Sequence, residues 1–95
     1  MAARSAHLAG DDGGSYIATV DADGQVLSID GPWVWPEKGE LVLTGELGGH
    51  RSATAPDHVM AEALERGEDV CFYDDTACRT CFCDGSGRMR CVPMC

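Results

Sequence analysis

Residues 71–95 read CFYDDTACRTCFCDGSGRMRCVPMC, and this stretch decides the fold more than any other. It holds all the cysteines of the chain, with the spacing C-x6-C-x2-C-x-C-x7-C-x3-C on Cys71, Cys78, Cys81, Cys83, Cys91 and Cys95. A segment this short, with few large apolar side chains, cannot bury enough surface to hold a shape alone. The cysteines therefore predict cross-links, either as disulfides or as metal ligands.

Charge divides the chain at about residue 70. Residues 1–70 carry 13 acidic side chains against four basic ones, which accounts for the whole net charge of −9, whereas residues 71–95 carry three of each. An acidic surface does not displace the counterions of nucleic acid, so nucleic-acid binding is not expected. The chain has no long apolar run of the kind that crosses a membrane, so membrane insertion is not expected either.

Composition suggests three segments. Residues 1–14 are small and polar and are expected to form an extended or flexible arm. Residues 15–69 are expected to form a small body that folds alone, and residues 70–95 a cysteine-rich module. The first residues lack an apolar h-region and do not resemble a secretory signal. The compartment is therefore open, with an extracellular, virion or other oxidising setting expected if disulfides form.

Three short stretches of the body have the composition of strands. They are Tyr16–Val20, Gln25–Ile29 and Glu40–Thr44, and turn residues separate them. A helix is expected to follow, capped by Thr54, opened by Pro56 and Asp57 and ended by Gly67. The predicted fold class is α+β: a small three-stranded antiparallel meander with one helix, followed by a cysteine-stapled hairpin tail.

The tail has the pattern of a disulfide-linked hairpin. Residues 81–83 are expected to form a strand that carries two of the thiols. Residues 84–87 then turn the chain, and residues 88–91 return antiparallel. Six cysteines leave no thiol over, and fifteen pairings are possible.

The pattern on Cys78, Cys81, Cys83, the turn Asp84–Gly87, Cys91 and Cys95 resembles the first half of the von Willebrand factor type C module. It also resembles pacifastin-type protease inhibitors, which share the C-x2-C-x-C arrangement. The pacifastin resemblance implies the pairs Cys71–Cys83, Cys78–Cys95 and Cys81–Cys91. The type C resemblance implies a role in protein binding.

Zinc is the competing interpretation of the cysteines. Cys78 with Cys81, and Cys91 with Cys95, are two pairs at spacings found in zinc sites. This alternative predicts a zinc-stabilised accessory protein.

Trp33 and Trp35 are the candidate protein-binding residues. Their i, i+2 spacing places both rings on one side of an extended segment, and Pro32 and Pro36 stiffen it. The pair is expected either to contact a partner or to cap the core.

Catalysis has little support in the sequence. The histidines are His7, His50 and His58, and nothing pairs one of them with a particular thiol. Gly45–Gly49 is glycine-rich, but no Lys-Ser/Thr pair follows it as in a phosphate-binding loop. The sequence therefore predicts a non-catalytic, cofactor-free structural or interaction protein that docks on a larger protein or assembly. A small protease inhibitor that presents Val92-Pro93-Met94 is a further alternative.

Overall fold

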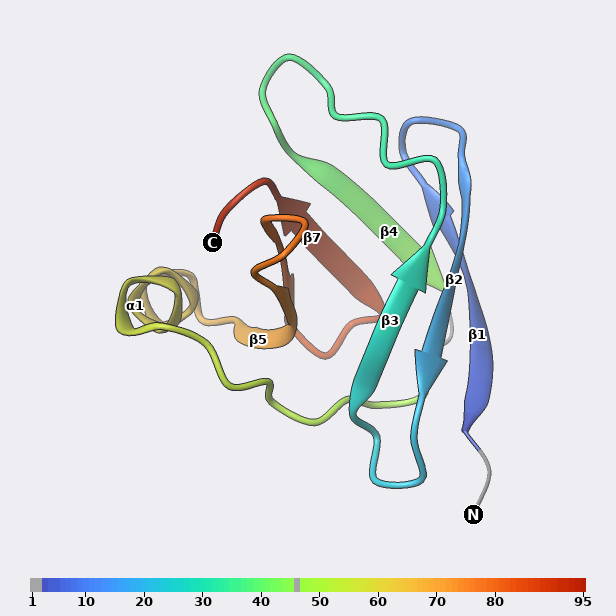
Figure 1. Ribbon diagram of the computed structural model, residues 1–95, viewed down its shortest axis with the longest axis horizontal. Coiled ribbons are helices and arrows are strands. Elements are labelled where there is room, and N and C mark those ends of the chain that lie inside the picture. The colour runs from blue at the N-terminus through green and yellow to red at the C-terminus, as the bar shows by residue number, and fades with distance from the viewer. Residues whose placement is uncertain (1–2, 46) are drawn as a thin grey trace.

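A computed structural model of the chain describes residues 3–45 and 47–95. This part contains seven strands and one helix (Figure 1). In chain order they are β1 (Arg4–Gly10), β2 (Ser15–Val20), β3 (Val26–Asp30), β4 (Leu41–Gly45), α1 (Asp57–Arg66), β5 (Asp69–Asp74), β6 (Arg79–Cys83) and β7 (Arg88–Val92). The sequence predicted the strands β2, β3 and β4 and the helix to within a residue or two.

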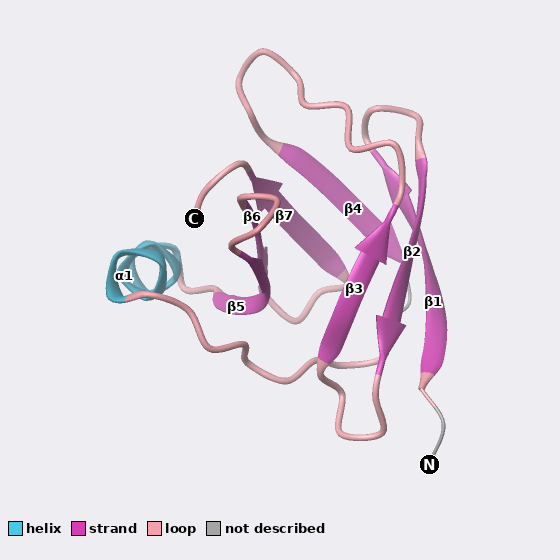
Figure 2. Ribbon diagram, in the orientation of Figure 1, coloured by secondary structure: helices cyan, strands magenta, loops and turns pink. Residues whose placement is uncertain are grey.

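All seven strands belong to one antiparallel sheet in the order β3-β2-β1-β4-β7-β6-β5. The two outermost strands, β3 and β5, approach each other, so the sheet curls into a nearly closed barrel (Figure 2). Helix α1 packs outside the barrel against β5. The predicted fold class, a three-stranded meander with one helix and a separate hairpin tail, is therefore wrong, because the chain is mostly β.

The path of β4 explains this error. A tight turn after β3 would have placed β4 beside it, but residues 31–40 instead pass over the end of the sheet, and β4 pairs with β1 and β7. Two prolines in this connection, Pro32 and Pro36, are incompatible with a short hairpin turn that continues the ladder. The consecutive meander is β1-β2-β3, without β4.

Strand β1 lies in the segment that was expected to be an extended or flexible arm. It is paired on both sides, with β2 and with β4. Ala6 and Leu8 point into the barrel, while Ser5 and His7 are exposed. The alternation is faint in the sequence because Leu8 is its only large apolar residue.

The cysteine-rich segment continues the same sheet. Strands β6 and β7 form the predicted hairpin, with Cys81 opposite Cys91. Leu43 on β4 then lies opposite Met89 on β7, and both side chains are buried. Residues 71–95 are therefore not a tail beside the body, since they supply three strands of its barrel.

Two apolar clusters stabilise the fold. The barrel interior contains Ala6, Leu8, Tyr16, Ala18, Val20, Val26, Ile29, Leu41, Leu43, Leu47, Cys71, Phe72, Cys81, Cys83, Met89 and Cys91. The second cluster lies between α1 and the outer face of β5 and β6 and contains Ala53, Val59, Ala63, Val70 and Phe82. The interior draws residues from both sides of the charge boundary.

The ends of α1 are set by backbone geometry. Gly67 adopts the left-handed conformation at φ 65° and ends the helix, as predicted. The expected cap, Thr54, is wrong: Pro56 occupies the N-cap position and no side chain caps the helix. Proline fixes φ at −59° there and begins the helix without a side-chain hydrogen bond.

Arg90 joins the strand β7 to two acidic side chains. Its guanidinium donates to both carboxylate oxygens of Glu68, at 2.8 and 3.3 Å, and lies 3.8 Å from the carboxylate of Glu40. The hydrogen bonds to Glu68 raise the pKa of Arg90 from its ordinary value. The guanidinium also lies over the ring of Phe82, 4.7 Å from its centroid.

Candidate functional site

Residues 31–40 connect β3 to β4 across one end of the barrel and carry both predicted binding residues. Trp33 has φ 49°, in the left-handed region that residues other than glycine seldom adopt. Its indole Nε1 donates to the carbonyl of Ile29 at 3.2 Å. This hydrogen bond and the ring packing described below hold Trp33 in a backbone conformation that costs about 1–2 kcal/mol.

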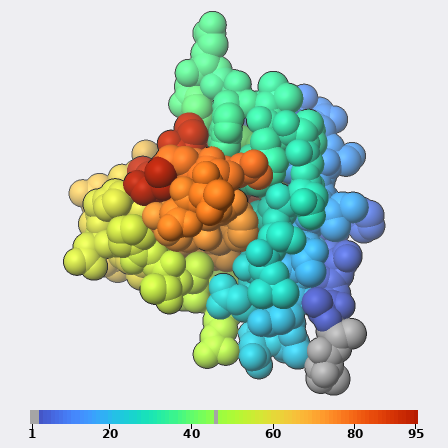
Figure 3. Space-filling view, viewed as in Figure 1, coloured from blue at the N-terminus to red at the C-terminus, as the bar shows by residue number. Residues whose placement is uncertain are grey.

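Three aromatic rings form a row at this end. Tyr16 and Trp33 meet edge to face with their centroids 5.5 Å apart, and Trp33 and Trp35 are 5.4 Å apart at 40°. The guanidinium carbon of Arg79 lies 4.5 Å from the Trp33 centroid. Figure 3 shows the orange β5–β6 turn, which ends at Arg79, against the blue-green segment that follows β3.

Tyr16 is the buried base of this row. Its side chain is 1% exposed, and its hydroxyl donates to the carboxylate of Asp12 at 2.9 Å. Burial raises the pKa of Tyr16 above its ordinary value, and the hydrogen bond to Asp12 and the Asp12 charge raise it further. The same carboxylate accepts from the amide of Gly14, so it also fixes the β1–β2 turn.

Val34 is the exposed large apolar residue of the segment. It is 61% exposed, while Trp33 and Trp35 on either side are half-buried and pack against the barrel interior. The two rings lie together, although Trp33 is not in the extended conformation that the prediction assumed. Both rings are half-buried and pack against the core. We call Trp33, Val34 and Trp35 the aromatic ridge.

The segments that meet at the aromatic ridge are rich in acidic residues. The segments 10–14, 30–40 and 74–79 come together here, since Gly14 lies against Pro32 and Arg79 lies over Trp33. These three segments carry seven Asp or Glu residues and two Lys or Arg residues. The segments next to the apolar ridge therefore carry a net negative charge.

Two residues of this surface were not predicted as site residues. Arg79 gave no sequence signal, because only the fold brings it onto Trp33. Val34 did carry one, because it is an apolar residue that stands directly between the two candidate binding residues.

The six cysteines form three disulfides, Cys71–Cys83, Cys78–Cys95 and Cys81–Cys91, and none is free. These are the pairs that the pacifastin resemblance implies. Three disulfides are compatible with an oxidising or extracellular setting. The four candidate zinc ligands, Cys78, Cys81, Cys91 and Cys95, therefore carry no thiolate for a metal.

Outside the disulfides, the described ranges 3–45 and 47–95 place no three His, Cys, Asp or Glu side chains together as a metal site. His7 is exposed on β1, His50 lies 3.5 Å from the carboxylate of Asp69, and His58 contacts the carbonyl of Cys95. Within the same ranges, no helix has the length and apolar character needed to cross a bilayer.

The segment Val92-Pro93-Met94 is held against the molecule. The Met94 carbonyl accepts from the buried hydroxyl of Thr80 at 2.6 Å, and the Met94 side chain packs against the second cluster. Pro93 is exposed, and its ring lies close to Gly39.

Comparison with protein-family models, with curated proteins and with solved structures finds no match to this chain. The likeness of residues 78–95 to type C and pacifastin modules therefore depends on the cysteine pattern alone, and any function must be argued from the site.

Proposed function

We propose that the chain is a non-catalytic protein-binding domain whose aromatic ridge docks on a larger protein. One observation carries the proposal: Val34, 61% exposed, stands in the chain between two tryptophans whose rings pack on the core. Such an anchor is already ordered before binding, so little conformational entropy is lost when it docks. Tryptophan is also among the residues that most often dominate interface energies.

The charge of the segments at the ridge indicates the kind of partner surface. The segments that meet at the ridge carry seven acidic side chains against two basic ones, so we expect the complementary surface to have an apolar centre and a basic edge. Opposite charges at the rim accelerate association more than they raise affinity. The rate of association should therefore fall as salt is added, while dissociation depends on the ridge.

The disulfides support the same role. Arg79, which covers Trp33, follows Cys78 directly, and the Cys78–Cys95 bridge fixes that turn. A disulfide-held turn against the ridge suits a binding surface that keeps one shape in the free and bound states.

The test begins with a photo-reactive amino acid at position 34, in cells that make the protein. The matched control carries it at position 64, where Leu64 is 80% exposed on α1. A single basic protein cross-linked from position 34 and not from position 64 is expected. The purified partner is then titrated with Val34→Asp and Leu64→Asp variants.

Val34→Asp should weaken binding at least tenfold, and Leu64→Asp should leave it unchanged. The thermal unfolding midpoints of both variants should stay near that of the parent, because both side chains are exposed. Equal affinity for the parent and Val34→Asp would refute the ridge as the binding surface.

A further inference from the structure

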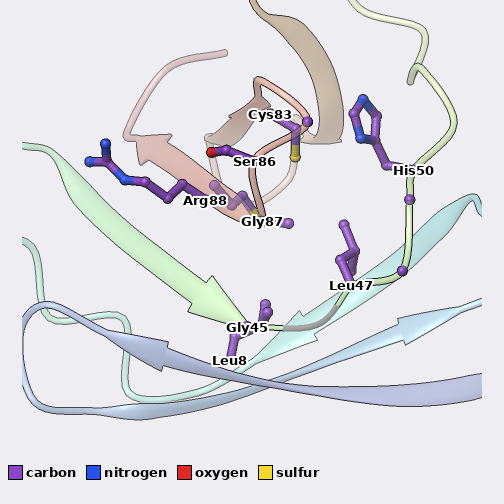
Figure 4. A pocket seen from close by; sticks show the side chains of 12 residues that line it. Leu8, Gly45, Leu47, His50, Cys83, Ser86, Gly87 and Arg88 are labelled. Carbon is purple, nitrogen blue, oxygen red and sulfur yellow. The ribbon is translucent and has the colours of Figure 1, made fainter.

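A second site lies at the other end of strand β4. The aromatic ridge precedes β4, whereas a cavity of about 500 Å³ opens beyond its last residue, Gly45 (Figure 4). Leu8, Leu47, Cys83 and Met89 are buried and form its apolar floor. The proposed docking of the ridge does not involve this cavity.

The cavity exists because two facing loops carry glycine instead of side chains. Gly45 and residues 47–49 line one wall, and residues 85–87 line the other. A Cβ atom added to Gly49 or to Gly85 would meet no atom within 4 Å, so the space beside both is open. The other end of the barrel is filled by Tyr16 and the two tryptophans.

The polar groups of the walls offer acceptors. His50 Nε2 lies 3.5 Å from Asp69 Oδ2, which favours a proton on Nε2 and leaves Nδ1 as an acceptor. Ser86 Oγ lies 2.6 Å from Asp84 Oδ1, so its hydroxyl donates to that carboxylate and keeps its own lone pairs. A ligand that carries a hydrogen-bond donor would therefore complement the acceptors of this cavity.

The lining of the cavity favours an uncharged ligand. Arg88 lines the cavity with its aliphatic stem, and its guanidinium points away (Figure 4). The floor is apolar, so a buried charge of either sign would lose its hydration without a partner. A volume of this size in the mouth of a β-barrel is typical of sites for small apolar molecules.

We propose that this cavity binds a small, uncharged, largely apolar molecule that carries a hydroxyl or amine donor. The probe for the test is N-phenyl-1-naphthylamine, an uncharged aromatic amine that fluoresces when it leaves water. The oxidised full chain should bind it saturably with one site. Ser86→Trp, which places a bulky ring at the rim, should weaken binding at least tenfold.

Two control variants separate this site from other apolar surfaces. Ser5→Trp adds the same ring on the exposed face of β1 and should leave probe affinity unchanged. Val34→Asp alters the aromatic ridge and should also leave it unchanged, so failure of the docking proposal would not affect this one. Loss of binding in either control variant would overturn the cavity assignment, as would the absence of saturable binding to the parent chain.

A measurement on the parent chain tests the proposal without a variant that could fail to fold. Amide resonances of Gly48, Gly49, Gly85 and Gly87 should shift on addition of the probe. Shifts confined to residues 31–40 would place the probe on the ridge and refute the proposal. His50→Leu should weaken binding by several-fold because it removes the acceptor while it keeps the volume similar.

Discussion

Tyr16 makes stability sensitive to alkaline pH. Its pKa is raised, so the folded state holds the phenol proton more tightly than the unfolded chain does. The stabilisation is complete below the ordinary tyrosine value of about 10 and is lost as the pH rises through the raised value. We expect the free energy of unfolding, measured with guanidinium between about pH 8 and about pH 11, to fall across this range.

Tyr16→Phe should remove most of that alkaline fall. At neutral pH it should lower the free energy of unfolding by about 2 kcal/mol, because the hydrogen bond to the Asp12 carboxylate is lost. Tyr73→Phe, at a half-buried tyrosine near α1, is the matched control and should keep the fall. An unchanged pH profile for Tyr16→Phe would contradict this account.

Gly31 is required for packing rather than for its backbone conformation. A Cβ atom there would overlap the ring of Tyr16, which cannot retreat because it is buried against Trp33. Gly31→Ala should therefore cost about 2–3 kcal/mol of unfolding free energy. Gly85→Ala, with open space but φ 87°, should cost about 1 kcal/mol by backbone strain alone. Equal losses in urea titrations would show that Tyr16 accommodates the methyl group.

At the scale of elements, the three disulfides differ in what they hold. Cys78–Cys95 ties the β5–β6 turn to the end of β7, outside the barrel interior. The other two bridges lie within the β5-β6-β7 meander, and Cys71, Cys81, Cys83 and Cys91 are buried. Removing the Cys78–Cys95 bridge should therefore loosen only the β5–β6 turn and the residues after β7. Removing either of the other two bridges should disturb the core.

The double variant Cys78→Ser, Cys95→Ser should lose about 3 kcal/mol of unfolding free energy while its circular dichroism stays that of the parent. The matched pair Cys81→Ser, Cys91→Ser should lose more, since it also buries two hydroxyl groups. Thiol reagent should modify no cysteine of the native parent. Labelling of four or more would contradict the disulfide assignment.

Sequence patterns predicted the elements better than their arrangement. Strands β2, β3 and β4 were recognisable because Tyr16, Val26 and Leu41 begin runs of alternating or β-branched residues. The pairing of β4 with β7 could not be predicted, because nothing in the sequence of either strand specifies a partner so distant in the chain. The tryptophans of the ridge were predicted as a pair. The cavity was not predicted, because the glycines that line it form no periodic pattern in the sequence.

At the scale of the whole molecule, the two halves of the chain complete one barrel. Removing residues 70–95 would expose the β7 side of β4 and take Cys71, Phe72 and Met89 out of the interior. The sequence favoured a body that folds alone, but the structure predicts that a chain ending at Asp69 shows no cooperative transition by circular dichroism. A sharp melting curve from that fragment would restore the two-domain division.

The placement of the disulfides has a consequence for how the molecule opens. All three bridges lie within residues 71–95, so the meander β1-β2-β3 is held only by non-covalent contacts. Partial unfolding should therefore be asymmetric. The amides of β2 and β3 should exchange with solvent hydrogen through sub-global openings that leave the hairpin β6–β7 closed. Such openings would separate the aromatic ridge and Tyr16 from Arg79, because Tyr16 and Trp33 belong to the half that opens and Arg79 to the half that stays closed.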